Sequence, residues 1–184
     1  MEVLEFVKAK AKEGAVALFV GGKSEAREAV KRAGTELDLP FVSGRWIGGT
    51  LTNWSEIKKR LQKLEELTSM RDKGELGKYT KKERLLIDRD IAKLTIYFGG
   101  ITNMKALPKL LIVVDPEKES IAVAEAKQMR IPVVAIAGSD SNLNNVDYAI
   151  PANDASKHSI ALIMNKIVEA YKSGASEIKK DEVK

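Results

Sequence analysis

The stretch Ala15-Val16-Ala17-Leu18-Phe19-Val20-Gly21-Gly22-Lys23-Ser24 joins a continuous apolar run to a glycine turn and the start of a helix. A strand that is apolar on both faces is typical of a parallel sheet with helices on both sides. Apolar runs of this kind return at residues 40–42, 110–114, 132–137 and 147–150. Helical periodicity lies between most of them, so the sequence predicts an α/β fold with five parallel strands.

The connection between the second and third of these strands is far longer than such connections usually are. Within it, Ile57, Leu61, Leu64 and Thr68 recur at helical spacing, and Ile87, Ile91, Leu94 and Phe98 repeat the pattern. Thr80-Lys81-Lys82-Glu83 has the form of a capping box, which starts the second helix. Two narrow apolar stripes joined by a short glycine-containing loop predict an antiparallel helical hairpin of coiled-coil type.

These patterns divide the chain into a discontinuous body and an insertion. We expect residues 1–44 and 105–174 to form the α/β body, and residues 45–104 to form the basic hairpin with its glycine-rich base. Residues 175–184 are charged and lack periodicity, which predicts a mobile tail after a last helix that ends at Gly174. Because the insertion falls between strands, a Gly-Ser linker in place of residues 50–98 is expected to leave the body folded.

Positive charge is concentrated in the middle of the chain. The net charge is +5, and residues 45–109 hold 15 basic and 8 acidic side chains, net +7. A basic segment in an otherwise near-neutral chain indicates a surface for a polyanion, most commonly nucleic acid, although a solvated lysine-rich face gives the same count. The candidate RNA-contacting residues on the hairpin and its base are Arg45, Trp46, Lys58, Lys59, Arg60, Lys63, Lys81, Lys82, Arg84, Arg89 and Lys93.

The composition excludes several classes of site. The 184 residues include no cysteine and one histidine, His158, so thiolate chemistry and multi-histidine metal sites are excluded. No apolar run approaches the ~20 residues of a membrane helix, and no secretory signal is visible at the N-terminus. These features predict a soluble intracellular protein with little obvious catalytic equipment, for which we expect no cofactor and no metal.

A degenerate phosphate loop is an alternative interpretation of one segment. Gly22-Lys23-Ser24 follows a strand and opens a helix, and Asp115 ends another strand, as in a nucleotide-binding site. However, the position that requires the first glycine of such a loop is Ala17. We therefore expect no nucleotide binding, and we expect Lys23→Ala to leave stability nearly unchanged, as for an exposed lysine.

Four segments together resemble one family, the small-subunit ribosomal protein two family of the bacterial and organellar type. The most specific is Arg45-Trp46-Ile47-Gly48-Gly49-Thr50-Leu51-Thr52-Asn53, within residues 41–54. The others are Thr80-Lys81-Lys82-Glu83, Phe98-Gly99-Gly100-Ile101-Thr102-Asn103-Met104 with the strand that leads to Asp115, and residues 146–154. The resemblance covers residues 3–173, and the usual family sequence has about seventy further N-terminal residues.

This resemblance implies a flavodoxin-like, three-layer fold with strand order 2-1-3-4-5 and a protruding hairpin. It implies a structural, non-catalytic role in translation as a cytoplasmic, ribosome-associated protein. The partners would be small-subunit ribosomal RNA (rRNA) and neighbouring ribosomal proteins near the head–body junction, with no membrane and no small-molecule substrate. Two other hypotheses remain open at this point: nucleotide binding through Lys23, Ser24 and Asp115, and a helical-hairpin adaptor for an acidic protein.

Overall fold

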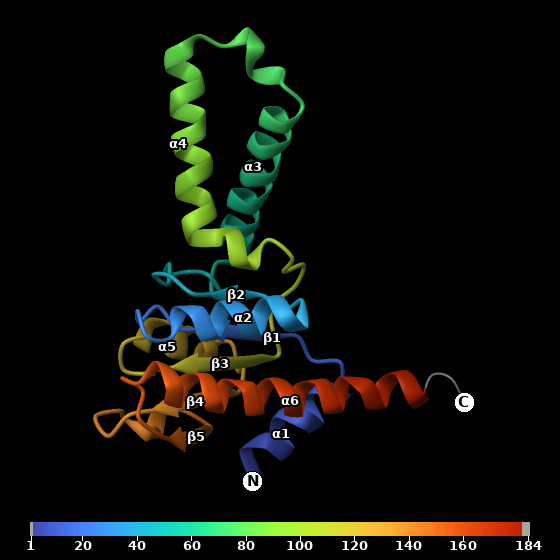
Figure 1. Ribbon diagram of the computed structural model, residues 1–184, viewed down its shortest axis with the longest axis vertical. Coiled ribbons are helices and arrows are strands. Elements are labelled where there is room, and N and C mark those ends of the chain that lie inside the picture. The colour runs from blue at the N-terminus through green and yellow to red at the C-terminus, as the bar shows by residue number, and fades with distance from the viewer. Residues whose placement is uncertain (1, 182–184) are drawn as a thin grey trace.

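A computed structural model describes residues 2–181, with side chains up to Glu177, and places five parallel strands in one sheet (Figure 1). The strands are β1 (Ala17–Val20), β2 (Phe41–Val42), β3 (Leu110–Val114), β4 (Val133–Ala137) and β5 (Tyr148–Pro151). Their order is β2-β1-β3-β4-β5, with Phe19 of β1 paired to Phe41 on one side and Ile112 on the other. The predicted α/β class and strand order are confirmed.

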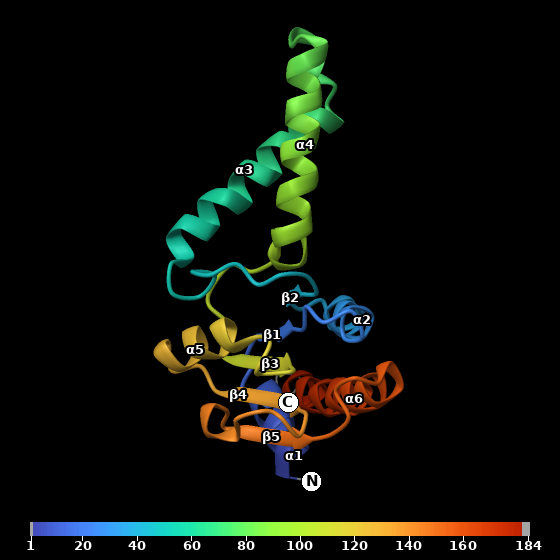
Figure 2. The ribbon, with the colours of Figure 1, turned by 90° about the vertical axis from the view of Figure 1, so that its left-hand side faces the viewer.

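Helices cover both faces of this sheet and form three layers (Figure 2). One face packs against α1 (Glu2–Lys12), α2 (Arg27–Leu37) and α6 (Lys157–Asp181), and the other packs against α5 (Ser120–Gln128). Successive strand residues point to opposite faces, so Phe19 joins the first core and Leu18 the second. Both are fully buried, as the continuous apolar run predicted.

The long insertion contains two helices that project away from the sheet (Figures 1 and 2). They are α3 (Trp54–Asp72) and α4 (Lys81–Phe98), joined through the short 3-10 turn η1 (Glu75–Lys78); a second such turn, η2 (Gly99–Ile101), follows α4. A third turn, η3 (Leu143–Asn145), precedes β5.

The base of the insertion belongs to the core of the body. Leu51, Ile57, Leu61 and Phe98 are buried in one cluster with Leu18 and other residues on the α5 face of the sheet. Removing residues 50–98 would therefore expose apolar sheet surface to water. These contacts contradict the expectation that a linker could replace this segment without harm to the body. Periodicity along the helices does not show that the start of α3 and the end of α4 pack into the body core.

The last helix continues through Gly174 to Asp181, so the predicted helix end at Gly174 and tail from residue 175 are wrong. Gly174 lies where α6 crosses α1: a Cβ atom at this position would lie 2.2 Å from the carbonyl oxygen of Lys8. The glycine therefore permits close helix packing instead of ending the helix. Beyond the crossing, Glu177 pairs with Lys8 at 2.6 Å and with Lys12 at 3.5 Å. Residues 182–184 of the predicted tail lie outside the described residues.

Within the described part of the chain, no helix is both long and apolar enough to cross a membrane. Among the same residues, no group of three or more metal-ligating side chains is placed to hold a metal ion.

Candidate nucleic-acid interface

The hairpin is held together by a narrow apolar seam. Ile57, Leu61 and Leu64 are the buried residues of α3, and Ile91 and Phe98 are those of α4. Most of the other positions on both helices are exposed, as the narrow stripes predicted, while Trp54, Leu94 and Tyr97 are half-buried against the core cluster at the base.

The turn at the tip of the hairpin is stabilised by local hydrogen bonds. The predicted capping box is present: the N–H of Thr80 donates to the Glu83 carboxylate at 2.8 Å, and the N–H of Glu83 donates to the Thr80 hydroxyl at 3.4 Å. Arg84 closes the tip by donating to the carbonyl oxygens of Tyr79 and Gly77, both at 2.9 Å. The charge of Arg84 is thus committed in part to folding the turn.

All nine basic hairpin residues predicted to contact RNA are exposed. Two form surface ion pairs, Lys59 with Glu56 at 2.6 Å and Lys63 with Asp90 at 3.4 Å. Among the residues whose side chains are described, six make no ion pair or side-chain hydrogen bond: Lys58, Arg60, Lys81, Lys82, Arg89 and Lys93. These six are the cations most available to a polyanion.

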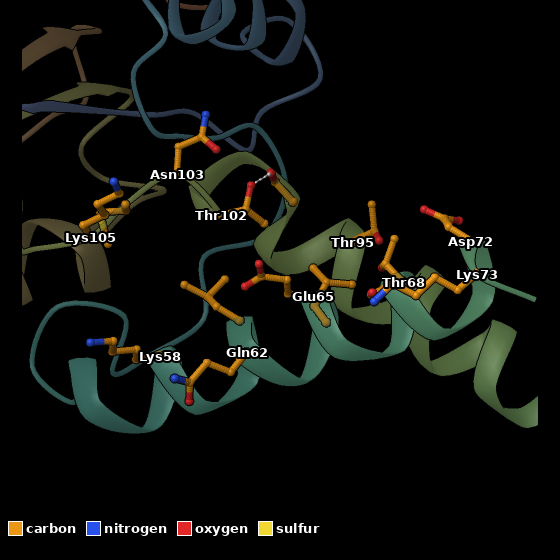
Figure 3. Close-up of a pocket in the computed structure, with 15 residues that line it drawn as sticks. Lys58, Gln62, Glu65, Thr68, Asp72, Lys73, Thr95, Thr102, Asn103 and Lys105 are labelled. Atoms are coloured by element: carbon orange, nitrogen blue, oxygen red, sulfur yellow. Dashed lines mark hydrogen bonds between the residues drawn. The ribbon is translucent and has the colours of Figure 1, made fainter. Parts of the chain in front are cut away.

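A groove of about 1100 Å³ lies between α3 and the chain that leaves α4 (Figure 3). Its wall mixes the cations Lys58, Lys73 and Lys105 with the carboxylates Glu65 and Asp72. Thr102 at its edge donates to the carbonyl oxygen of Gly99 at 3.1 Å. Because cations and carboxylates are mixed in its wall, the groove presents no single-signed surface, and of the six unpaired hairpin cations only Lys58 lines it.

The loop before the hairpin is fastened to α5 by one buried carboxylate, which the sequence did not reveal as a site. Glu125 accepts hydrogen bonds from the Trp46 indole N–H at 3.1 Å and from the backbone N–H groups of Gly49, Leu51 and Thr52 at 2.8, 2.9 and 3.1 Å. The Thr52 hydroxyl adds a fifth at 3.2 Å. The only sequence signal is a glutamate in the otherwise apolar Ile121–Ala126 face of a short helix.

The hydrogen bonds decide the charge state of Glu125. Burial of the carboxyl disfavours its ionisation, but the donors of Trp46, Leu51, Thr52 and Gly49 outweigh burial and hold its pKa below the ordinary range. Glu125 is therefore an ionised acceptor that keeps the residue 45–52 loop in place. We call Glu125 and its donors the α5 anchor.

The α5 anchor bears on one RNA candidate. Trp46, predicted to contact RNA, is only 6% exposed and its indole N–H is already bonded to Glu125. It supports the hairpin base, and burial leaves little of its ring exposed for an RNA base. Arg45, the residue before it, is exposed.

The turn after β1 is also occupied by internal contacts. The ammonium of Lys23 donates to Asp115 at 3.0 Å and to Asp154 at 3.2 Å, and both aspartates are buried. Desolvation works against the charged lysine, but these two carboxylates outweigh it and raise the pKa of Lys23. The expectation that Lys23 is an exposed lysine without special contacts is therefore wrong. The sequence did not reveal the pairing with Asp154, because the two residues lie far apart along the chain.

The remaining groups of that turn are engaged as well. The N–H of Gly22 donates to the buried carboxyl of Glu119 at 2.9 Å, and the Ser24 hydroxyl donates to Glu25 at 2.7 Å. Burial raises the pKa of Glu119, with the Asp115 charge adding to the effect and the Gly22 bond opposing it. A phosphate loop would need the Lys23 ammonium and these donors free, so the geometry does not favour nucleotide binding.

The family model described as "Ribosomal protein S2" matches residues 1–174. The chain belongs to the ribosomal protein S2 family. Two curated relatives named small ribosomal subunit protein uS2 are each 43% identical to it, one from Bdellovibrio bacteriovorus over 173 residues and one from Helicobacter hepaticus over 176. The alignments cover 94% and 96% of this chain but 55% and 67% of the relatives. This S2-family chain thus spans between about half and two-thirds of their length.

Proposed function

We propose that this protein is a structural, non-catalytic component of the small ribosomal subunit, acting in translation in the cytoplasm. It binds small-subunit rRNA and neighbouring ribosomal proteins near the head–body junction. One observation carries the proposal: a chain of the S2 family projects a hairpin whose basic residues are exposed, in a segment of net charge +7. The names of the relatives, small ribosomal subunit protein uS2, support the same assignment.

The chemistry of this surface favours backbone contact over base reading. Lysines and arginines on two helices attract phosphates regardless of sequence, and each neutralised phosphate releases counterions. The logarithm of the affinity then falls with the logarithm of salt concentration by about 0.7 to 0.9 for each contact. Preference for rRNA would come from RNA shape and from the fixed orientation of the hairpin on the body.

The test compares two charge variants that lose the same charge at different places. The hairpin variant replaces the unpaired hairpin cations by Gln: Lys58, Arg60, Lys81, Lys82, Arg89 and Lys93. The control variant replaces exposed lysines outside the hairpin by Gln: Lys12, Lys31, Lys109, Lys127, Lys157 and Lys166. Both sets are on the surface, so both variants are expected to fold.

Filter binding to a small-subunit rRNA transcript and co-sedimentation with small subunits depleted of uS2 measure the outcome. The parent chain should bind both, and the hairpin variant should lose at least tenfold more rRNA affinity than the control, with a flatter salt dependence. Equal losses in both variants would show that net charge alone matters. Absence of parent binding to rRNA, with retention of an acidic protein instead, would favour the adaptor hypothesis.

A further inference from the structure

A second basic surface lies where the body meets the loop before the hairpin helices. It is a pocket of about 430 Å³ whose lining includes Arg27 from the start of α2, Arg45 from the loop after β2, and Lys118 from the segment between β3 and α5. The segments before α2 and before α5 leave the carboxyl ends of β1 and β3, where the strand order reverses direction. In open parallel sheets, ligands bind in the crevice at such a point.

The three cations of this pocket are available. All are exposed, and among the residues with described side chains none of them forms an ion pair. The Arg27 Nε–H donates to the carbonyl oxygen of Gly22 at 3.0 Å, which orients the guanidinium and leaves its terminal nitrogens free. The α5 anchor restrains the loop that carries Arg45, because the adjacent Trp46 is bonded to Glu125.

The acidic side chain that lines the pocket, and one beside it, already accept hydrogen bonds. Glu119 lines the pocket and accepts a hydrogen bond from the Gly22 N–H, while Glu25, close to Lys118, accepts one from the Ser24 hydroxyl.

A count of charges along the sequence does not reveal this surface, since residues 110–184 contain 9 basic and 11 acidic residues. Four of those acidic side chains, Asp115, Glu119, Glu125 and Asp154, are buried in the structure. The outer surface of this segment is therefore more positive than its composition indicates.

An exposed apolar side chain completes the pocket. Ile121, in the first turn of α5, lines it and is 59% exposed. Cations beside an uncovered aliphatic surface match a nucleotide within an RNA strand, whose phosphate is charged and whose ribose and base are partly apolar. Inorganic phosphate would use only the cations. A nucleoside triphosphate would need donors that Gly22 and Lys23 spend inside the protein.

We propose that this pocket is a second rRNA contact, in which Arg27, Arg45 and Lys118 hold a backbone phosphate and Ile121 packs against the ribose or base of the same nucleotide. The proposal rests on the proposed function and extends the RNA surface from the hairpin to the body. With two separated contacts, the rRNA would be held at the hairpin and at the carboxyl edge of the sheet. This arrangement fixes the orientation of the whole protein on the RNA.

Photo-crosslinking tests the contact without altering any cation. Ile121→p-benzoylphenylalanine places the probe at the pocket, and Leu162→p-benzoylphenylalanine places it at an equally exposed apolar position, 63% exposed, on α6 across the sheet. With a small-subunit rRNA transcript, position 121 should crosslink at least tenfold more than position 162. Equal crosslinking at the two positions would overturn the proposal.

Two double variants test the charges. Arg27→Gln with Lys118→Gln should weaken binding of the transcript about tenfold and reduce the slope of the salt dependence by about one phosphate contact. Lys157→Gln with Lys166→Gln, on α6, should change affinity less than twofold. Thermal melts followed by circular dichroism show whether each variant folds. If a charge variant does not fold, the crosslinking comparison decides the proposal.

The outcomes separate the two proposals. If the parent chain does not bind the transcript, the proposed function fails. If the parent binds and the Arg27/Lys118 variant binds equally well, only the second contact is refuted. In the last experiment, the parent chain is titrated with inorganic phosphate and with ATP. The proposal would be overturned if either anion binds with a Kd of millimolar or tighter and Arg27→Gln abolishes that binding without loss of RNA affinity. The pocket would then be a small-anion site.

Discussion

Replacing Glu125 by glutamine is expected to release the base of the hairpin from the body. Glutamine keeps the size of the side chain but offers one acceptor oxygen where the carboxylate offers two. In the native structure, Trp46 and Gly49 donate to one oxygen and Leu51 and Thr52 to the other. The amide oxygen can satisfy one of these pairs, and the NH₂ group then faces the donors of the other.

The magnitude follows from the groups left without an acceptor. If the Leu51 and Thr52 N–H groups lose their partner, the buried Leu51 donor costs about 1–3 kcal/mol, and the part-buried Thr52 donor costs less because water can reach it. A total of about 2–4 kcal/mol is a large part of the 5–15 kcal/mol that separates folded from unfolded states in most domains. Because the loss is confined to the residue 45–52 loop, we expect that loop to detach before the sheet unfolds.

Tryptophan fluorescence can follow this loop directly. The chain has two tryptophans, so Trp54→Phe leaves Trp46 as the sole reporter. In that background, urea denaturation at pH 7 should show an early red shift of Trp46 emission in Glu125→Gln, at lower urea than the loss of helical circular dichroism. Glu117→Gln, which removes an exposed carboxylate nearby, is the matched control and should leave both transitions unchanged.

The pH dependence has a defined sign. The folded-state pKa of Glu125 is depressed, so its contribution to the free energy of unfolding is complete above the unfolded value of about 4.3 and disappears as pH falls through the lower folded value. The difference between parent and Glu125→Gln should shrink over that acidic range. A glutamine variant that stays within about 0.5 kcal/mol of the parent at pH 7 would show that the five hydrogen bonds do not hold the loop.

Three further substitutions are expected to change stability. Glu119→Gln should raise the free energy of unfolding at pH 7 by on the order of 1 kcal/mol, because the amide oxygen still accepts the Gly22 N–H while the cost of a buried charge disappears. Since the folded pKa of Glu119 is raised, this gain should vanish as pH falls below about 4.3, and a loss of stability at pH 7 would contradict it. Lys23→Ala should cost about 2–4 kcal/mol in urea denaturation, because Asp115 and Asp154 lose their common cation; Lys31→Ala, on the exposed side of α2, is the control. Gly174→Ala should cost about 1–3 kcal/mol and increase hydrogen exchange in α1, because the added Cβ meets the backbone at Lys8; Ser173→Ala should have little effect on either measurement.

Much of the fold was determined by local patterns in the sequence. Apolar runs such as residues 110–114 predicted buried parallel strands, because only a sheet covered on both faces lacks a polar side. The narrow stripe through Ile57 and Leu61 predicted the helical hairpin, and the Thr80–Glu83 pattern predicted its second helix start. These signals depend on neighbours within a few residues, so they can be read without knowing the tertiary structure. The concentration of exposed basic residues on the hairpin was evident in the same way.

The tertiary structure alone decided which polar residues meet. Glu125 contacts donors more than seventy residues away, and Lys23 reaches Asp154 across the sheet. No periodicity marks such pairs, because a buried hydrogen bond depends on where the backbone brings two groups and not on their spacing along the chain. For the same reason, the sequence revealed neither that Trp46 is a buried donor nor that Gly174, predicted as a helix end, is a point of close helix packing. The basic pocket on the body was also hidden, since burial of Asp115, Glu119, Glu125 and Asp154 removes from the surface charges that a sequence count includes.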